Sequence, residues 1–256
     1  MNRSKGIIIF SIFAIFLVAS VGANDLVLTI VYDNNPYRKG LETRWGFSCL
    51  VEGLDRTILF DVGGEGLLTL KNMERLKIDP QEVDIVMLSH IHYDHIGGLS
   101  CFLKRNSDVR VYIPKSFPQS IKREAKIEGA ELVGVDHSIE ICKNAYSTGE
   151  LGSWIKEQSL IIKTSKGLVI ITGCAHPGIV NIVKRAKEIT GADVYLIVGG
   201  FHLCWMNSGQ VKKIIRGAQK EGVEKVAPCH CSGDLARQER PRTPKDSVPY
   251  ILIRMI

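Results

Sequence analysis

Short apolar runs alternate with polar, glycine-containing breaks along most of the chain. Runs rich in β-branched residues and bounded by turn residues predict strands, and apolar positions three or four residues apart predict helices. The predicted strands are Leu26–Tyr32, Trp45–Val51, Arg56–Asp61, Asp84–Ser89, Val109–Ile113, Leu132–Val135, Ile139–Ile141, Ser159–Thr164, Gly167–Thr172, Ala192–Val198, Lys225–Pro228 and Tyr250–Arg254. The predicted helices are one within Gly63–Leu76 and three at Ser116–Ile127, Ile179–Ile189 and Gly209–Glu221.

The order of these elements indicates the fold class. The first half is rich in strands, and the second half alternates strands with helices, which predicts an α+β fold of two mixed sheets packed together with helices outside. No linker rich in Gly, Ser or Pro separates the halves, so residues 24–256 are predicted to form one domain. Hydrophobic residues make up 45% of the chain and charged residues 23%, as in ordinary globular proteins.

The N-terminus has the composition of a targeting segment. Residues 2–6 are basic, Ile7 to Val21 is a continuous run of apolar and small residues, and Ala23 provides a small residue at a cleavage position. The run is short for a membrane span, which needs about 20 residues. Residues 1–23 are therefore predicted to be a signal peptide or an N-terminal anchor, with a buried strand as the alternative. The protein would be exported, or held in a membrane through residues 7–21 if the segment stays uncleaved.

The charge and the cysteines narrow the function classes. The formal net charge is +6, which favours a solvated basic surface over a basic rim that attracts an anionic substrate. No basic stretch is interleaved with aromatic residues, so no nucleic-acid partner is predicted. The seven cysteines have no spacing typical of a disulfide framework, and Cys229 and Cys231 flank His230.

The candidate chemistry lies directly after the predicted strand Asp84–Ser89. His90, His92, Asp94 and His95 stand within six residues of one another. Alternate residues of an extended backbone point the same way, so His90 and His92 can bind one ion while Asp94 and His95 face a second. Imidazole and carboxylate groups are ligands that zinc prefers. The alternative is a histidine-rich surface loop.

The spacing His90-x-His92-x-Asp94-His95 resembles the signature of the metallo-β-lactamase superfamily. Asp61 resembles the aspartate of the superfamily's first motif, which supports the metal-binding loop. The resemblance covers most of the chain from Leu26 onward. It implies an αββα sandwich with two divalent metal ions at one edge, zinc in the first place and iron or manganese as alternatives.

The remaining ligands depart from the superfamily pattern. Cys174 stands where the resemblance implies a bridging aspartate, and it is either a ligating thiolate or an inert packed thiol. His176 follows it at a strand end, and His230 resembles the superfamily's last ligand. Six of the seven histidines lie at predicted strand ends, where sites in α/β proteins gather. The predicted metal ligands are His90, His92, Asp94, His95, Cys174, His176 and His230.

Three further motifs are similar to a subgroup of the superfamily. They are Thr172–Gly178, Gly199–His202 and His230–Gly233, and they resemble the dihydropterin-ribofuranosylaminobenzene-phosphate synthases of the methanopterin pathway. This subgroup resemblance implies a condensation that displaces pyrophosphate. These motifs are strong evidence of a relationship to the subgroup but only weak evidence of which substrate is used.

The preferred hypothesis is a hydrolase in which a dinuclear centre activates water against a phosphate or carboxylic ester of a small anionic substrate. Asp94 would orient the nucleophile as well as bind metal. His202 would donate a hydrogen bond to the substrate or leaving group, or would only pack behind the ligands. Export would separate the protein from pterin precursors, which favours hydrolysis over condensation. The alternatives are the pterin-type synthase, a di-iron redox protein and a non-catalytic metal-binding protein.

Overall fold

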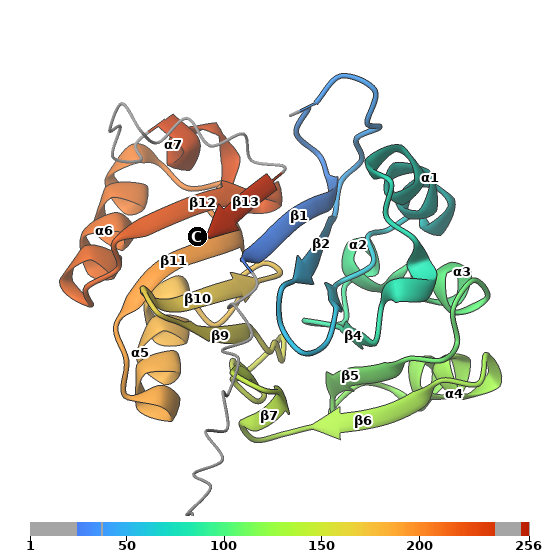
Figure 1. Ribbon diagram of the computed structural model, residues 1–256. Helices are drawn as coiled ribbons and strands as arrows, with labels where there is room; N and C mark the ends of the chain where they lie inside the picture. The colour runs from blue at the N-terminus through green and yellow to red at the C-terminus, as the bar shows by residue number, and fades with distance from the viewer. Residues whose placement is uncertain (1–24, 37, 239–251, 256) are drawn as a thin grey trace, which may run out of the picture.

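Two β-sheets packed face to face form the centre of the structure, a computed structural model that describes residues 25–36, 38–238 and 252–255 (Figure 1). The first sheet has the order β13-β1-β2-β3-β4-β5-β6. Its strands are β13 (Leu252–Met255), β1 (Leu26–Asp33), β2 (Phe47–Glu52), β3 (Ile58–Phe60), β4 (Ile85–Met87), β5 (Arg110–Pro114) and β6 (Glu131–Val135). Neighbouring strands from β13 through β1 and β2 to β3 pair antiparallel. Neighbouring strands from β3 through β4 and β5 to β6 pair parallel, so the sheet is mixed.

The second sheet is also mixed and has the order β12-β11-β10-β9-β8-β7. Its strands are β12 (Lys225–Cys229), β11 (Val194–Gly200), β10 (Gly167–Thr172), β9 (Leu160–Thr164), β8 (Ala145–Ser147) and β7 (Ile139–Cys142). Strands β10, β11 and β12 run parallel, while β7 to β10 pair antiparallel.

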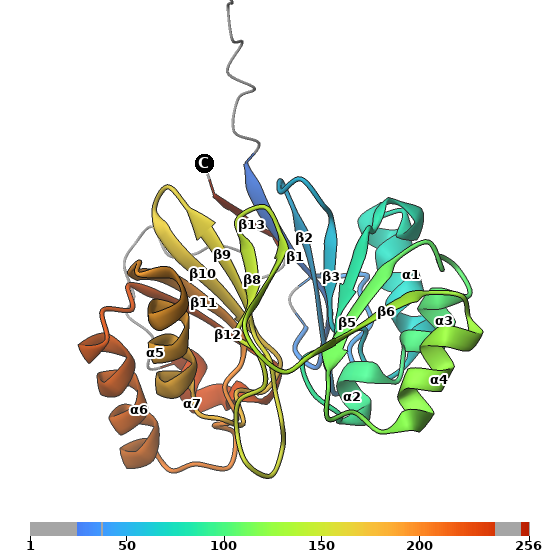
Figure 2. The same ribbon diagram turned by 90° about the horizontal axis from the view of Figure 1, so that it is seen from below.

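Helices cover the outer face of each sheet, as Figure 2 shows from the end of the sandwich. On the first sheet lie α1 (Gly66–Leu76), α2 (Tyr93–Ile96), α3 (Leu99–Leu103) and α4 (Gln119–Ile127). On the second lie α5 (Ile179–Thr190), α6 (Ser208–Lys220) and α7 (Gly233–Gln238). Single 3-10 turns occupy Pro80–Glu82 and His230–Ser232.

The hydrophobic core between the sheets holds the sandwich together. Leu28, Phe47 and Phe60 from the first sheet and Val169 and Val198 from the second are completely buried in one cluster. Burying each such side chain stabilises the fold by about 1.5–3 kcal/mol relative to leaving it exposed. Two further clusters lie between each sheet and its own helices, so the apolar runs of the strands are buried on both faces, as expected for central strands.

The predicted fold class, two mixed sheets with helices outside, is confirmed. The hairpin predicted around residues 52–55 joins β2 to β3, and the predicted closing strand is β13. The sequence pattern did not predict β8 or the short helices α2 and α3, because three to five residues are too few to display a period. All seven cysteines lie in the described part of the chain and are unpaired.

The carboxyl ends of several parallel strands lie at one edge of the sandwich, where the histidine-containing segments begin. Strands β4, β10, β11 and β12 end at this edge, and the histidine-containing segments follow them directly. Polar residues at the ends of four strands, which belong to two sheets, are thereby brought to one edge, as happens at the carboxyl ends of strands in open α/β sheets.

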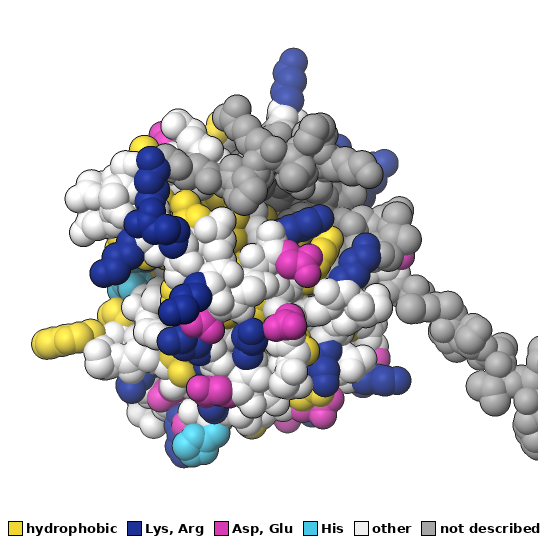
Figure 3. Space-filling view, turned by 90° about the vertical axis from the view of Figure 1, so that its left-hand side faces the viewer, with side chains coloured by type: hydrophobic (Ala, Val, Ile, Leu, Met, Phe, Trp, Pro, Cys, Tyr) yellow, Lys and Arg dark blue, Asp and Glu magenta, His cyan; other side chains and the backbone are white. Residues whose placement is uncertain are grey.

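Basic and acidic side chains are interspersed on the face formed by α5 and α6 (Figure 3). Lys184 lies 3.7 Å from Glu221, and Lys187 lies 3.0 Å from Asp193. This face therefore fits the solvated surface that the net charge favoured.

Candidate metal centre

A buried carboxylate from the first sheet fixes the histidine loop. Asp61 is fully buried, and its Oδ1 accepts a hydrogen bond of 2.7 Å from the backbone nitrogen of Ser89. Its Oδ2 lies 2.7 Å from the hydroxyl of Ser89 and 2.7 Å from Nδ1 of His95. Burial raises the pKa of Asp61, and His95 and Ser89 act against that rise. One side chain thus holds both ends of the loop from Ser89 to His95.

This network determines which ring nitrogens of the first-sheet histidines carry lone pairs. The Ser89 hydroxyl donates its one proton to Asp61, so it accepts from Nδ1 of His90, 2.8 Å away. The remaining nitrogen, Nε2 of His90, is therefore an acceptor, and so is Nε2 of His95, whose Nδ1 donates to Asp61. Burial lowers the pKa of His90 well below its usual range, which keeps this ring neutral and able to bind a cation.

A second buried carboxylate, Glu157, plays the same part in the second sheet. Its Oε1 accepts backbone hydrogen bonds of 3.0 and 2.9 Å from Cys174 and Ala175, and its Oε2 accepts from both the backbone and Nδ1 of His176, each at 2.8 Å. Burial opposes ionisation, but the His176 hydrogen bonds and the neighbouring imidazoles outweigh it and hold the pKa of Glu157 below its usual range. Because Nδ1 of His176 donates to Glu157, its Nε2 is left as an acceptor.

The turn after β1 orients the last histidine. Asp33 accepts a hydrogen bond of 3.1 Å from the backbone nitrogen of His230, and Asn34 Oδ1 lies 2.8 Å from Nδ1 of His230. Nε2 of His230 lies 3.2 Å from Asp94 Oδ2, yet among the described residues it is buried without a hydrogen-bond partner. A nitrogen lone pair and a carboxylate that face each other in this way fit a cation between them.

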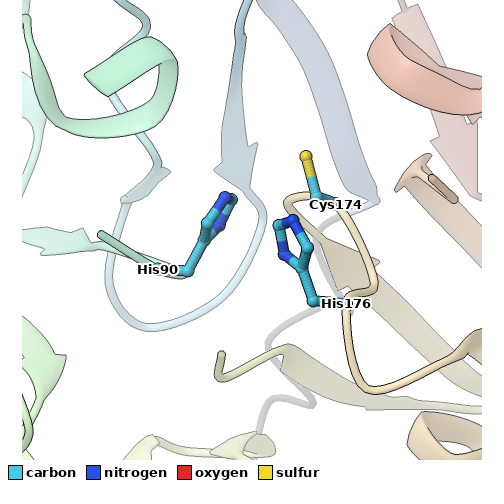
Figure 4. Close-up of side chains that lie close together, drawn as sticks. All are labelled: His90, Cys174 and His176. Carbon is cyan, nitrogen blue, oxygen red and sulfur yellow. The ribbon is translucent and has the colours of Figure 1, made fainter. Parts of the chain in front are cut away.

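The acceptor atoms converge in two groups that could each hold a metal ion. One consists of His90, Cys174 and His176, which Figure 4 shows facing one another, and the other of His95, Cys174 and His230. In each group the donor atoms lie within 4.8 Å of one another. The sulfur of Cys174 is common to both and lies 3.3 Å from Nε2 of His95. Neutral imidazole nitrogens, a carboxylate and a thiol are the donor set of zinc sites, so these residues fit divalent metal ions.

The structure brings all seven predicted ligands to this edge. His92 faces the first group, with its Nδ1 3.1 Å from Nε2 of His90, and Asp94 faces the second, with Oδ2 3.5 Å from Nε2 of His95. The ring of His202, predicted as a hydrogen-bond donor to substrate, lies 4.7 Å from the ring of His176. The ring nitrogen of His202 that could bind a metal ion instead lies in one group with the sulfurs of Cys174 and Cys231.

Sequence reasoning missed several residues that orient or surround the site. Glu157 and Asn34 lie in segments with no strand or helix pattern, and no motif distinguishes them. Trp45 and Trp205 are also absent from the predicted site, although their rings lie 4.8 Å from that of His230 and 5.5 Å from that of His202. Only Trp205, three residues after His202, stands near a histidine motif in the sequence.

Replacing Glu157 by glutamine should lower the affinity for divalent metal by about 10- to 100-fold, as loss of a group that orients a ligand does. The amide has one acceptor oxygen for the donors that now meet two, and its NH₂ would face the donors around His176. Competition titration of zinc against a chromophoric chelator measures the change. Glu188→Gln, at an exposed carboxylate, is the control and should match the wild type. Equal affinities for all three proteins would contradict the role given to Glu157.

Two curated proteins of Methanocaldococcus jannaschii are similar to most of the chain. One is 7,8-dihydropterin-6-methyl-4-(beta-D-ribofuranosyl)-aminobenzene-5'-phosphate synthase, 29% identical over 82% of this chain and 88% of that enzyme. The other is an uncharacterized protein, 26% identical over 81% of this chain and 91% of that protein. The resemblance to the synthase subgroup is thereby confirmed.

The prediction of export, or of membrane anchoring through residues 7–21, is wrong. It is overturned by the match to these two relatives, which extends over about nine tenths of their own lengths. Among the described residues no helix is long and apolar enough to cross a membrane. The predicted signal or anchor itself lies outside the described residues. An apolar run has the same composition in a signal, an anchor and a buried segment, so composition alone did not determine a destination.

The solved structure of Tm1679, described as a metal-dependent hydrolase of the beta-lactamase superfamily, has a similar fold and sequence. It superposes with a TM-score of 0.68 at 29% identity, over 83% of this chain and 91% of that one. The model of the metallo-beta-lactamase superfamily matches residues 46–185, which include Asp61, the loop after β4 and the segment of Cys174 and His176. With its αββα sandwich and with these groups at the expected edge, the chain belongs to the metallo-beta-lactamase superfamily.

Proposed function

We propose that the protein is a metal-dependent enzyme that displaces the leaving group of a phosphate or carboxylic ester, with water as the attacking group. The observation that carries this proposal is the convergence of imidazole acceptors from both sheets on the single sulfur of Cys174. The thiol and imidazole donors favour zinc as the resident cation.

When bound, two divalent cations supply Lewis acidity that lowers the pKa of water and stabilises charge on the attacked centre. Asp94 is the residue that would accept a hydrogen bond from the attacking water. Its Oδ2 lies 3.2 Å from Nε2 of His230 and 3.5 Å from Nε2 of His95, and its side chain is partly open to water. Asp94 can therefore hydrogen-bond to the attacking water and orient it.

The rim of the site supports a substrate with a planar aromatic part. Trp45 is 48% exposed and Trp205 is 72% exposed, and their ring centroids lie 6.0 Å apart at 51°. Large aromatic side chains left this exposed forgo burial that would stabilise the fold. They stand beside His230 and His202, from opposite halves of the sandwich. We propose that a ring of the substrate packs against both tryptophans while its anionic ester group reaches the metals.

Replacing Trp45 by alanine should raise KM for an aryl ester by up to about tenfold and leave kcat almost unchanged, because an aromatic pair contributes about 0.5–1.5 kcal/mol to binding. The same substitution should not affect KM for an alkyl ester. Trp154→Ala is the matched control, because Trp154 is 97% exposed and makes no ring contact with a histidine in the described part. Steady-state kinetics on paired aryl and alkyl substrates provide the measurement. Equal losses on both substrates would exclude an aromatic subsite.

A synthase is the second candidate, and two observations favour it. The relative of that name matches 82% of the chain, and the exposed tryptophans suit aromatic reactants. The earlier objection, that export would separate the protein from pterin precursors, falls with the prediction of export. The description of Tm1679 as a hydrolase supports the first candidate at the same identity.

The deciding experiment compares both reactions on the metal-loaded full chain. A hydrolase needs only water, so it should turn over an aryl phosphodiester, a lactone or a thioester in the absence of any other reactant. A synthase should release pyrophosphate only when an aromatic pyrophosphate donor and an aromatic acceptor are both present. Zinc-loaded protein that is inert in every assay would refute both proposals and leave a metal-binding protein.

A further inference from the structure

A third group of metal-type donors adjoins the two described above. Cys174, His202 and Cys231 each offer a donor atom, and these atoms lie within 4.8 Å of one another. The sulfurs of Cys174 and Cys231 are 3.3 Å apart, and both residues are buried. Cys231 follows His230 directly, so the 3-10 turn at the end of β12 presents a histidine to one group and a thiol to the next.

The backbone around Cys231 is arranged to receive a charged sulfur. The backbone N–H of His202 donates to Sγ of Cys231 at 3.3 Å, and those of Leu203 and Cys204 donate to its carbonyl oxygen at 3.0 and 3.1 Å. Hydrogen bonds to sulfur favour a thiolate over a thiol. A side chain at Gly200 would place its Cβ 2.7 Å from the sulfur of Cys231, so only glycine leaves room for it.

His202 contributes a buried polar atom that lacks a hydrogen-bond partner among the described residues. Its Nδ1 is buried without a hydrogen-bond partner in the described part of the chain, which is costly for a polar atom unless something else binds it. Its backbone has a φ of +54°, a left-handed conformation that is uncommon for residues other than glycine. Strain of this kind persists where the surrounding structure requires it and is concentrated at functional sites.

We propose that Cys174, His202 and Cys231 form a third, sulfur-rich metal position, which binds a thiophilic divalent cation such as zinc or cadmium. Thiolate and imidazole select such ions over magnesium, calcium or manganese. Each thiol releases its proton to solvent as it binds. The position depends on the proposed dinuclear centre only through the shared sulfur of Cys174.

This assignment gives His202 a second role beside the predicted one. A neutral imidazole can present a lone pair to a metal at one ring nitrogen while the other nitrogen keeps its proton and donates it. The ring of His202 lies between those of His176 and Trp205 and adjoins Cys231, so the ligand role accounts for both thiols and the predicted role for neither.

The test is titration of the metal-free full chain with cobalt(II), whose near-ultraviolet charge-transfer absorption arises from thiolate ligands. Cys231→Ser should lower this absorption by roughly half, because one of two thiolates is lost. Cys142→Ser, at a partly exposed thiol on β7, is the matched control and should keep the full absorption. His202→Asn, which tolerates the left-handed backbone, should weaken cobalt binding at the thiolates and decides the matter if Cys231→Ser does not fold.

The outcomes separate this proposal from the dinuclear one. His92→Ala should abolish hydrolysis and keep the absorption that depends on Cys231. An absorption that is unchanged in Cys231→Ser and in His202→Asn would overturn the third position while leaving the dinuclear centre intact. A Cys174–Cys231 disulfide in the purified protein, detected by thiol titration, would overturn it as well, because oxidised sulfurs do not ligate.

Discussion

A His176→Ala variant should lose about a thousandfold in turnover, equivalent to about 4 kcal/mol of transition-state stabilisation. It should also bind at least one metal ion fewer. His176 is the only imidazole that the second sheet contributes to the group of His90 and Cys174, and Glu157 orients it for that purpose. Metal analysis of the purified variant and its initial rates measure the two effects. The wild type treated with a chelator should show the same loss of rate, and zinc should restore it.

His137→Ala is the matched control for this experiment. His137 is the one histidine that lies away from the cluster, on the exposed segment between β6 and β7. Its removal should change neither the metal content nor the rate. If the His176 variant retained full metal and full turnover, the dinuclear proposal would be refuted, whatever the chain's resemblance to other members of the superfamily.

An Asp61→Asn variant should lose about 3 kcal/mol or more of its free energy of unfolding, because breaking a buried charged network leaves donors unsatisfied. The carboxylate meets three donors: the backbone nitrogen and hydroxyl of Ser89, and Nδ1 of His95. An amide offers one acceptor oxygen and turns a donor toward the others. Asparagine tolerates the φ of +56° found at this position, so the loss would not come from the backbone.

Urea denaturation of the metal-free proteins measures this loss, with equal m-values as the sign that both unfold from the same state. Asp193→Asn is the control, since the Asp193 side chain is exposed and forms a surface ion pair with Lys187, and its loss should stay within about 0.5 kcal/mol. An Asp61→Asn variant as stable as the control would mean that the histidine loop is held by packing alone.

Several parts of the molecule were predictable because they depend on local patterns. Continuous apolar runs predicted the buried strands β4, β10 and β11, since a strand covered on both faces has no polar positions. The spacing of His90, His92 and His95 after such a strand predicted that their side chains lie close together beyond the strand end, where they can bind metal. The superfamily pattern singled out Cys174, the position of His176 at a strand end singled out that residue, and the structure places both in the first candidate group.

Other parts depend on tertiary packing and leave no local signal. Glu157 stands between Lys156 and Gln158, a context typical of an exposed loop, yet it is almost completely buried under the turn that follows β10. The contact between the sulfurs of Cys174 and Cys231 joins residues 57 positions apart in the sequence. Neither fact follows from periodicity or from a motif, because both arise only when segments distant in the sequence come together at the end of the second sheet.

The division of the ligands between two sheets has a consequence for assembly. His90 and His95 belong to the first half of the sandwich, and His176 and His230 belong to the second. An ion that needs ligands from both halves can bind only after they have docked. Free zinc at a hundredfold excess over its Kd would add about 2.7 kcal/mol to the docked state by mass action. The concentration of metal in the cell would then set how firmly the two halves stay docked. A shortage of metal would favour their separation before it unfolded either half.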